Sequence, residues 1–253
     1  MPKLTHDLIE RAVPPAPPGP AAPAPDELRL RAEMLVFLHG RDPALGLWVF
    51  ADDALMRDHG EAAPDIAAPA RLPGLARRYT VRDVQDRGTP AAPALALALE
   101  EVPALACAGL LLHLPGPKVE DRLWPVWRRK MAAGGHDPRW RDALLTRAHD
   151  GSGAPVRALC FLARHNHPLY EGEQPLGTVA DRLARARGPG GAAAGALLDA
   201  AETLRRHGLR DALLESLEAE VARHLSPPAA PAAPPLPIEA GRARAAREAA
   251  GRA

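Results

Sequence analysis

Charged residues in two segments of this sequence could take part in proton transfer or bind a charged ligand. Lys130 lies in WRRKM, residues 127–131, and is one of only three lysines in a chain that otherwise uses arginine. A lysine keeps its proton at neutral pH because its ordinary pKa is about 10.4, and only strong desolvation could make it a base. Nearby carboxylates have the opposite effect and hold the ammonium charged. Asp52 and Asp53 are adjacent carboxylates that follow the apolar segment LWVF.

Three other kinds of reactive side chain are less suited to catalysis. His165 and His167 in HNH would point to the same face of a strand, but no Cys or His pair completes the three or four ligands that zinc requires. We therefore expect structural roles for both. Ser152 lies in the turn DGSG without a partner that would make it a nucleophile. Cys107 and Cys160 lie inside apolar runs and are expected to be buried thiols.

Apolar segments predict the elements that position these residues. LWVF is typical of a short buried strand, and it leads into a turn at Asp52 and Asp53. Further strands are predicted at 105–114, 140–148 and 156–164. A helix is predicted over 119–131, where Pro125 should kink or split it. We expect the tryptophans of this region to belong to the core; they are Trp124, Trp127 and Trp140.

The second half of the chain is predicted to be helical. Three amphipathic segments cover 178–187, 192–207 and 211–225, and Asp211 is suited to cap the last of them. In that last helix an apolar residue recurs every four positions, at Leu213, Leu217, Val221 and Leu225. Because strands come first and helices last, the order favours an α+β fold with a small mixed or antiparallel sheet.

Composition indicates where the domain begins and ends and which classes of partner the sequence does not support. Proline-rich segments at 14–25 and 227–237 predict an N-terminal segment with a linker (1–43), one domain (44–226) and a disordered, mildly basic tail (227–253). The 32 basic residues balance 31 acidic ones, which gives no argument for a nucleic-acid or anionic-membrane partner. No apolar run approaches the roughly 20 residues of a membrane span, and there is no apolar leader segment. We expect a cytoplasmic protein.

Six segments resemble the bacterial ChaC-type γ-glutamylcyclotransferases in order and spacing, over roughly residues 45–225. They are LWVF (47–50), RGTP (87–90), WRRKM with PRW (127–140), VRALCFLARHNHPLYEG (156–172), RGPGG (187–191) and the closing GLRDALLESLEAEV. The resemblance implies a small β-barrel flanked by helices. It also implies an activity without metal or cofactor, in which the glutamyl α-amine of glutathione attacks its own γ-carbonyl and releases 5-oxoproline and Cys-Gly.

The resemblance also locates the substrate loop, and the sequence departs from the family there. The family's Tyr-Gly-Ser-Leu loop, whose backbone N–H groups hold the charged end of the substrate, corresponds to Asp52, Asp53, Ala54 and Leu55. Two carboxylates therefore face a region meant for an anion, and a like-charge contact at ~4 Å costs on the order of 1 kcal/mol or more. The resemblance also assigns Phe50 to substrate binding.

Further departures affect the pocket itself. The family's Gly-Pro-Ser-Gly segment, with the Asn and Tyr that follow it, has become GPGGAAAGALL, which places Ala193 at the Asn and Ala196 at the active-site Tyr. His136 replaces another aromatic residue.

The family's proton-transferring Glu corresponds to Lys130. One interpretation is a reused base with a lowered pKa; the other, which we favour, is a charge that pairs with Asp52 or Asp53 and closes the pocket. The sequence thus predicts a family member with little or no activity towards glutathione or another small γ-glutamyl compound. The alternative is a non-catalytic protein that binds a small amine-bearing ligand or a protein partner.

Overall fold

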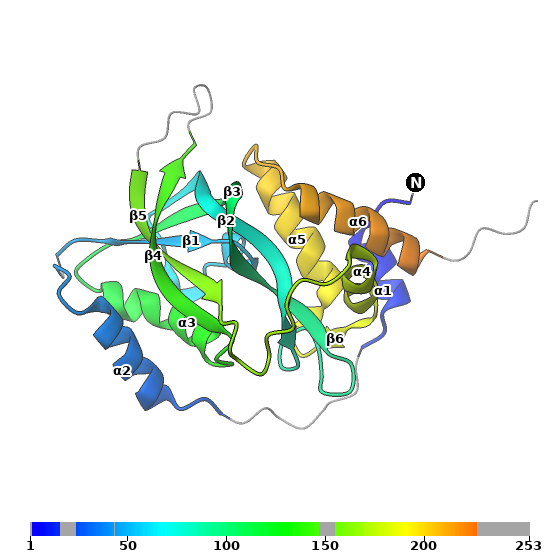
Figure 1. The fold of residues 1–253 in the computed structure, drawn as a ribbon, viewed down its shortest axis with the longest axis horizontal. Coiled ribbons are helices and arrows are strands. Elements are labelled where there is room, and N and C mark those ends of the chain that lie inside the picture. The colour runs from blue at the N-terminus through cyan, green and yellow to red at the C-terminus, as the bar shows by residue number, and fades with distance from the viewer. Residues whose placement is uncertain (1, 16–23, 43, 147–154, 227–253) are drawn as a thin grey trace, which may run out of the picture.

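The computed structural model describes residues 2–15, 24–42, 44–146 and 155–226. The expectations for Ser152 and for the tail at 227–253 lie outside these ranges, as does most of the first proline-rich segment. Within the described ranges, five strands close into a barrel in the order β1-β3-β2-β4-β5, and helices cover it (Figure 1). The predicted α+β class with a small barrel is confirmed.

The barrel strands pair mostly in an antiparallel sense. They are β1 (Leu47–Ala51), β2 (Ile66–Asp83), β3 (Ala94–Leu114), β4 (His136–Leu145) and β5 (Pro155–Ala163). The long β2–β3 pair forms most of the wall, and β1 closes the barrel by pairing antiparallel with β3 and parallel with β5. The predicted strands at 105–114, 140–148 and 156–164 are thus parts of β3, β4 and β5, with different bounds.

Strand β2 and the first half of β3 were not predicted from the sequence. Pro69, Pro73 and Gly74 interrupt the apolar pattern of β2, and such residues normally argue against a strand. The β2–β3 register shifts between Pro73 and Leu75, so the bulge absorbs this interruption and the ladder continues on both sides of it.

Side chains alternate between the barrel interior and its outer face. The interior cluster takes residues from all five strands, such as Phe50, Leu72, Leu99, Ala143 and Cys160. The alternate residues of the strands, such as Val49 and Leu110, face the helices instead. Cys107 belongs to the interior as well, and both cysteines are buried free thiols, as predicted. Burial raises the pKa of Cys107 to about 11.

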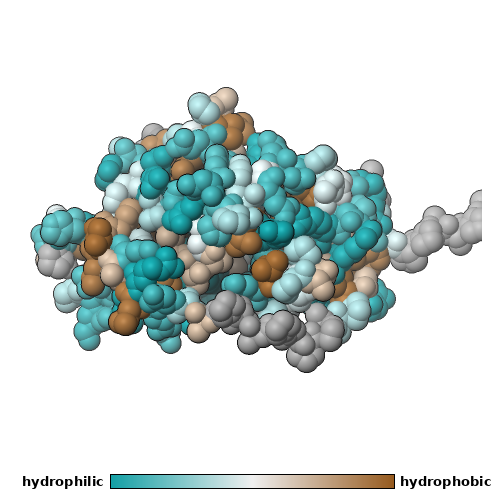
Figure 2. All heavy atoms as spheres, turned by 60° about the horizontal axis from the view of Figure 1, so that its bottom comes forward, coloured by the Kyte–Doolittle hydropathy of each residue, from teal (hydrophilic) through white to brown (hydrophobic). Residues whose placement is uncertain are grey.

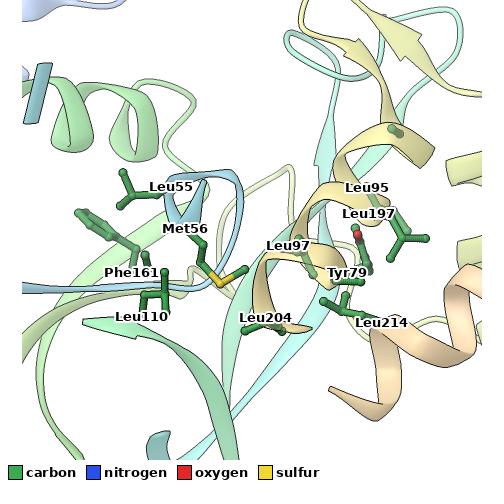
Figure 3. Close-up of a cluster of buried hydrophobic side chains, with 14 of the residues drawn as sticks. Leu55, Met56, Tyr79, Leu95, Leu97, Leu110, Phe161, Leu197, Leu204 and Leu214 are labelled. Atoms are coloured by element: carbon green, nitrogen blue, oxygen red, sulfur yellow. The ribbon is translucent and has the colours of Figure 1, made fainter. Parts of the chain in front are cut away.

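Two layers of helices cover the outer face (Figure 1). On one side lie α1 (His6–Ala12), α4 (Leu176–Arg185), α5 (Ala193–Arg206) and α6 (Ala212–Leu225), and on the other lie α2 (Glu27–Leu38) and α3 (Val119–Met131). Figure 3 shows leucines of α5 facing Tyr79, Leu95 and Leu97 of the long strands. The part of the chain that the structure describes contains no helix that is long and apolar enough to cross a membrane.

The three C-terminal helices confirm the sequence pattern, whereas α1 and α2 were not predicted. Asp211 caps α6, accepting hydrogen bonds from the N–H groups of Leu213 and Leu214. Of the predicted stripe on α6, Leu217 and Val221 are buried while its two ends are only partly buried. The two N-terminal helices lie within residues 1–43, on either side of the predicted proline-rich linker, and each buries apolar side chains against the body; in α2 these are Leu30, Met34 and Leu38.

Helix α3 continues through Pro125, so the expected split is wrong. The inner face of the helix buries Leu123, Val126 and Trp127, and this burial offsets the roughly 3 kcal/mol that an interior proline costs. Trp127 is fully buried, and Trp124 and Trp140 pack at the edge of the core, as predicted.

Candidate functional site

The loop after β1 is held in place by its own carboxylates and by neighbouring strands. Asp53 caps the short 3-10 helix at Ala54–Met56 and accepts a hydrogen bond from the N–H of Leu55 at 3.0 Å. Asp52 is only 1% exposed because it directly follows the buried strand β1. Both carboxylates are therefore fixed at the end of β1 rather than mobile in solvent.

Lys130 brings its ammonium group to this loop from the last turn of α3. Its Nζ donates to Asp53 Oδ2 at 2.8 Å and to Asp52 Oδ1 at 3.1 Å. The Lys130 side chain is 4% exposed, whereas Asp53 retains 22%. The predicted pairing of Lys130 with these acids is confirmed, and it involves both of them.

Burial and neighbouring charges have opposite effects on the pKa values of this cluster. Burial disfavours the charged form of Lys130, but Asp52 and Asp53 outweigh it and raise the pKa of the ammonium above its ordinary value. Burial likewise opposes ionisation of Asp53, yet Lys130 and Arg129 lower its pKa well below the usual range. For the more deeply buried Asp52, burial raises the pKa despite Lys130. Lys130 and Asp53 are thus a fixed ion pair at neutral pH.

Arg77 of β2 ties this loop to the C-terminal helices and was missed by the sequence reasoning. Its buried guanidinium donates to the carbonyl oxygens of Asp52 at 2.6 Å and Ala108 at 2.8 Å, and to the carboxylate of Asp211 at the start of α6. The side chain is fully buried. An arginine inside a strand with apolar neighbours was the only available signal, and it does not reveal partners that are 25 to 134 residues away.

A pocket of about 200 Å³ opens beside the ion pair, between the long strands, the end of α3 and the start of α5. Of the predicted site residues, Asp53, Ala54, Lys130 and Ala196 line it, as do His136 and Ala193. The other three do not line it: Phe50 lies in the barrel interior, Leu55 in the core under the helices, and Asp52 behind Lys130. The remaining wall combines apolar residues with charged ones; the apolar residues include Tyr79, Val81, Leu95, Leu97 and Leu169, and the charged ones are Arg82, Asp83, Asp86, Arg87 and Arg129.

His136 lines this pocket, and one of its ring nitrogens is buried without a hydrogen-bond partner among the described residues. Its Nδ1 lies 3.1 Å from the carbonyl oxygen of Lys130, which can only accept a hydrogen bond, so Nδ1 carries the proton. Nε2 is then an acceptor, and it has no partner of suitable geometry among the described residues, although the Leu97 backbone lies near the ring. Burial and the charge of Lys130 lower the pKa of His136 to about 4. The ring is neutral at pH 7.

Two glycine-containing motifs pack against each other at the rim of the pocket. Gly190 of RGPGG donates its N–H to the carbonyl oxygen of Asp86, directly before RGTP, at 2.8 Å. A Cβ on Gly188 would lie 2.4 Å from that oxygen and 2.6 Å from the carbonyl oxygen of Gly88. Only glycine permits so close an approach of two backbones. This contact holds Asp86 and Arg87 at the pocket rim.

The HNH segment makes contacts within the protein. His165 Nε2 lies 2.6 Å from Glu100 Oε2, and Thr80 donates to the other oxygen of Glu100 at 2.7 Å. His167 Nδ1 accepts from the N–H of Leu169. In the part of the chain that the structure describes, no three His, Cys, Asp or Glu residues are grouped to hold a metal ion.

Comparisons with known proteins agree on one family. The family model described as ChaC-like protein matches residues 47–224. The glutathione-specific γ-glutamylcyclotransferase of Escherichia coli (strain K12) is 28% identical over 180 residues, which cover 71% of this chain and 74% of that protein. γ-Glutamylcyclotransferase 2-3 of Arabidopsis thaliana is 23% identical over 184 residues, covering 72% and 90%.

The fold is shared with a solved structure. The crystal structure of a glutathione-specific γ-glutamylcyclotransferase from yeast aligns with a TM-score of 0.63 at 16% identity, covering 71% of this chain and 97% of that one. At this identity the likeness concerns the fold alone.

Proposed function

Since the chain belongs to the family of ChaC-like, glutathione-specific γ-glutamylcyclotransferases, we propose that it is a non-catalytic member, which binds a small amine-bearing ligand without turning over glutathione. The observation that carries this proposal is the position of Lys130. Its ammonium group lies between two carboxylates, at the position that the sequence resemblance assigns to the proton-transferring Glu.

Lys130 cannot replace that Glu in proton transfer. A group that accepts a proton from an amine must itself be unprotonated at working pH. Here the two carboxylates raise the pKa of Lys130, so the unprotonated form is rarer than for a free lysine. Deprotonation would also leave Asp53 without its main charge partner in a buried position, which is costly.

The substrate loop has also lost its means of holding an anion. The N–H of Leu55 donates to the Asp53 side chain and is therefore occupied within the protein. The Asp53 carboxylate lines the pocket with 22% of its side chain exposed, so an incoming carboxylate would meet a like charge at the loop itself, whereas the arginines of the pocket wall come from other elements. Both features disfavour a substrate whose charged end binds at this loop.

The pocket that remains suits a small ligand with an N–H donor. His136 is part of the pocket lining and its buried Nε2 is an unpaired acceptor, which a ligand N–H would satisfy once the ring turns towards the pocket; leaving such a buried group unsatisfied costs roughly 1–3 kcal/mol. Asp53 adds a partly exposed carboxylate on the same wall. The volume of about 200 Å³ lies below the roughly 300–1,000 Å³ of pockets for drug-sized ligands, which favours a compact amine.

Two assays test the two halves of the proposal. Mass spectrometry should find no 5-oxoproline after purified protein is incubated with glutathione, while the Escherichia coli relative, assayed alongside, supplies the positive control. Thermal-shift measurements with putrescine and propylamine, neither of which carries a carboxylate, should reveal stabilisation, which reaches about 2.7 kcal/mol at a hundredfold excess over the Kd. His136→Phe should abolish that stabilisation. If neither probe stabilises the wild type, the ligand half is wrong; 5-oxoproline formation would refute the non-catalytic half.

A further inference from the structure

Helix α2 has two apolar faces, and only one of them is covered by the described residues. Leu30, Met34 and Leu38 point into the body of the protein. On the opposite side Leu28 is 84% exposed and Val36 is 76% exposed. A helix that is apolar on opposite faces is normally buried on both.

The exposed residues form a continuous stripe rather than scattered positions. At about 100° per residue, Leu28, Ala32, Leu35 and Val36 lie within roughly 100° of one another around the helix. Leu35 is 48% exposed, and Ala32 is exposed as well. Figure 2 shows apolar side chains gathered over α2, at the left of that view. This stripe, Leu28–Ala32–Leu35–Val36, is termed the outer α2 stripe.

We propose that the outer α2 stripe is covered by the same stripe of a second copy of this chain, with the two α2 helices antiparallel. With the two-fold axis at Ala32, Leu28 of each copy meets Val36 of the other. The small Ala32 side chains at the crossing allow the two helices to approach closely. An interface of this kind is self-complementary, as a two-fold dimer requires.

The charges beside the stripe favour an antiparallel pair of identical helices. Arg29 and Glu33 flank the same edge of the stripe and form an exposed ion pair at 3.3 Å. In an antiparallel pair this edge faces its own copy in reverse, so Arg29 of one chain lies near Glu33 of the other. A parallel two-fold pair would instead bring this edge against the opposite edge of the partner's stripe, so Arg29 and Glu33 would not face their own copies. The edge is thus complementary to itself in one orientation only.

The size of the stripe sets the expected affinity. One helix face is smaller than the roughly 800 Å² per partner of a standard stable interface. We therefore expect a reversible dimer with a Kd in the micromolar range. This inference goes beyond the proposed function and does not depend on it, because α2 lies outside the residues that match the family and contributes none of the residues that line the pocket.

Sedimentation velocity of the full chain over a micromolar concentration series tests the dimer. The wild type should shift from monomer to dimer, and Leu28→Glu should remain monomeric because two acids then meet the apolar stripe. Leu105→Glu is the matched control, since Leu105 is 46% exposed on β3 and this variant should dimerise like the wild type. A wild type that stays monomeric throughout, or a Leu28→Glu variant that still dimerises, would overturn the proposal.

Disulfide trapping tests the orientation. Ala32→Cys should give a covalent dimer under mild oxidation, because the two positions meet at the two-fold axis. Leu28→Cys alone should not, whereas a mixture of Leu28→Cys and Val36→Cys chains should. The native Cys107 and Cys160 are buried and should not interfere. Efficient trapping of Leu28→Cys with itself, without trapping at Ala32, would contradict the antiparallel arrangement.

Discussion

Lys130 Nζ lies 2.8 Å from Asp53 Oδ2, although 77 residues separate the two along the chain. The contact joins the last turn of α3 to the loop after β1, the two elements to which the family resemblance assigns the proton-transfer position and the substrate loop. Asp52 accepts a second hydrogen bond from the same ammonium group. Lys130 and the two acids at 52 and 53 therefore form one charged cluster, and removing the ammonium group would leave the acids without their common partner.

Removing the Lys130 ammonium should destabilise the fold strongly. We expect Lys130→Met to lower the free energy of unfolding by about 3–5 kcal/mol, because two buried carboxylates lose their common partner. The control is Arg129→Met, whose guanidinium lies 3.7 Å from Asp53 and is 41% exposed, with an expected cost below about 1 kcal/mol. Urea denaturation measures both. Equal costs for the two variants would contradict a buried ion pair at Lys130.

His136 should make stability depend on pH below neutrality. Its pKa is lowered from an ordinary 6.5 to about 4, so the unfolded chain takes up a proton at higher pH than the folded one. Stability should therefore fall as pH decreases from about 6.5 to 4, by roughly 3 kcal/mol in total from this group. His136→Phe should remove that part of the slope in urea denaturation at several pH values. An unchanged slope would show that the buried ring does not resist protonation.

Arg77 should be essential for the fold, whereas its neighbour should not. Arg77→Met leaves two carbonyl oxygens and the Asp211 carboxylate without their donor, so we expect a loss of about 3–5 kcal/mol. Arg78→Met is the control, because the one acidic side chain that Arg78 meets within the described ranges is the exposed Glu173, at 3.4 Å. Its cost should stay below about 1 kcal/mol. A mild effect of Arg77→Met would mean that the link between the loop and α6 contributes little.

Local sequence signals predicted the elements that one segment specifies by itself. The apolar run LWVF, the three amphipathic C-terminal helices and the Asp211 cap all rest on neighbours within a few residues. The Lys130 pairing could also be predicted. The resemblance places a lysine where the family has an acid and two aspartates in the substrate loop, and it places these positions near each other. The boundaries of the domain remain a prediction.

Features that depend on long-range contacts were missed. β2 becomes a strand because it pairs along its length with β3, which overrides its prolines. α2 has little amphipathic contrast, since apolar residues occupy both of its faces, so periodicity could not reveal it. The free acceptor of His136 depends on a backbone carbonyl six residues away and on the shape of the pocket, neither of which sequence spacing encodes.

The central claim is tested most directly by measuring 5-oxoproline release from glutathione by the wild type and Lys130→Ala, at several pH values from about 6 to 9. Over this range Lys130 should stay protonated, because its pKa is raised above an ordinary value of about 10.4. The account predicts no release above the spontaneous background by either protein at any of these pH values. Release by the wild type that rises with pH and disappears in Lys130→Ala would contradict it and identify Lys130 as a working base.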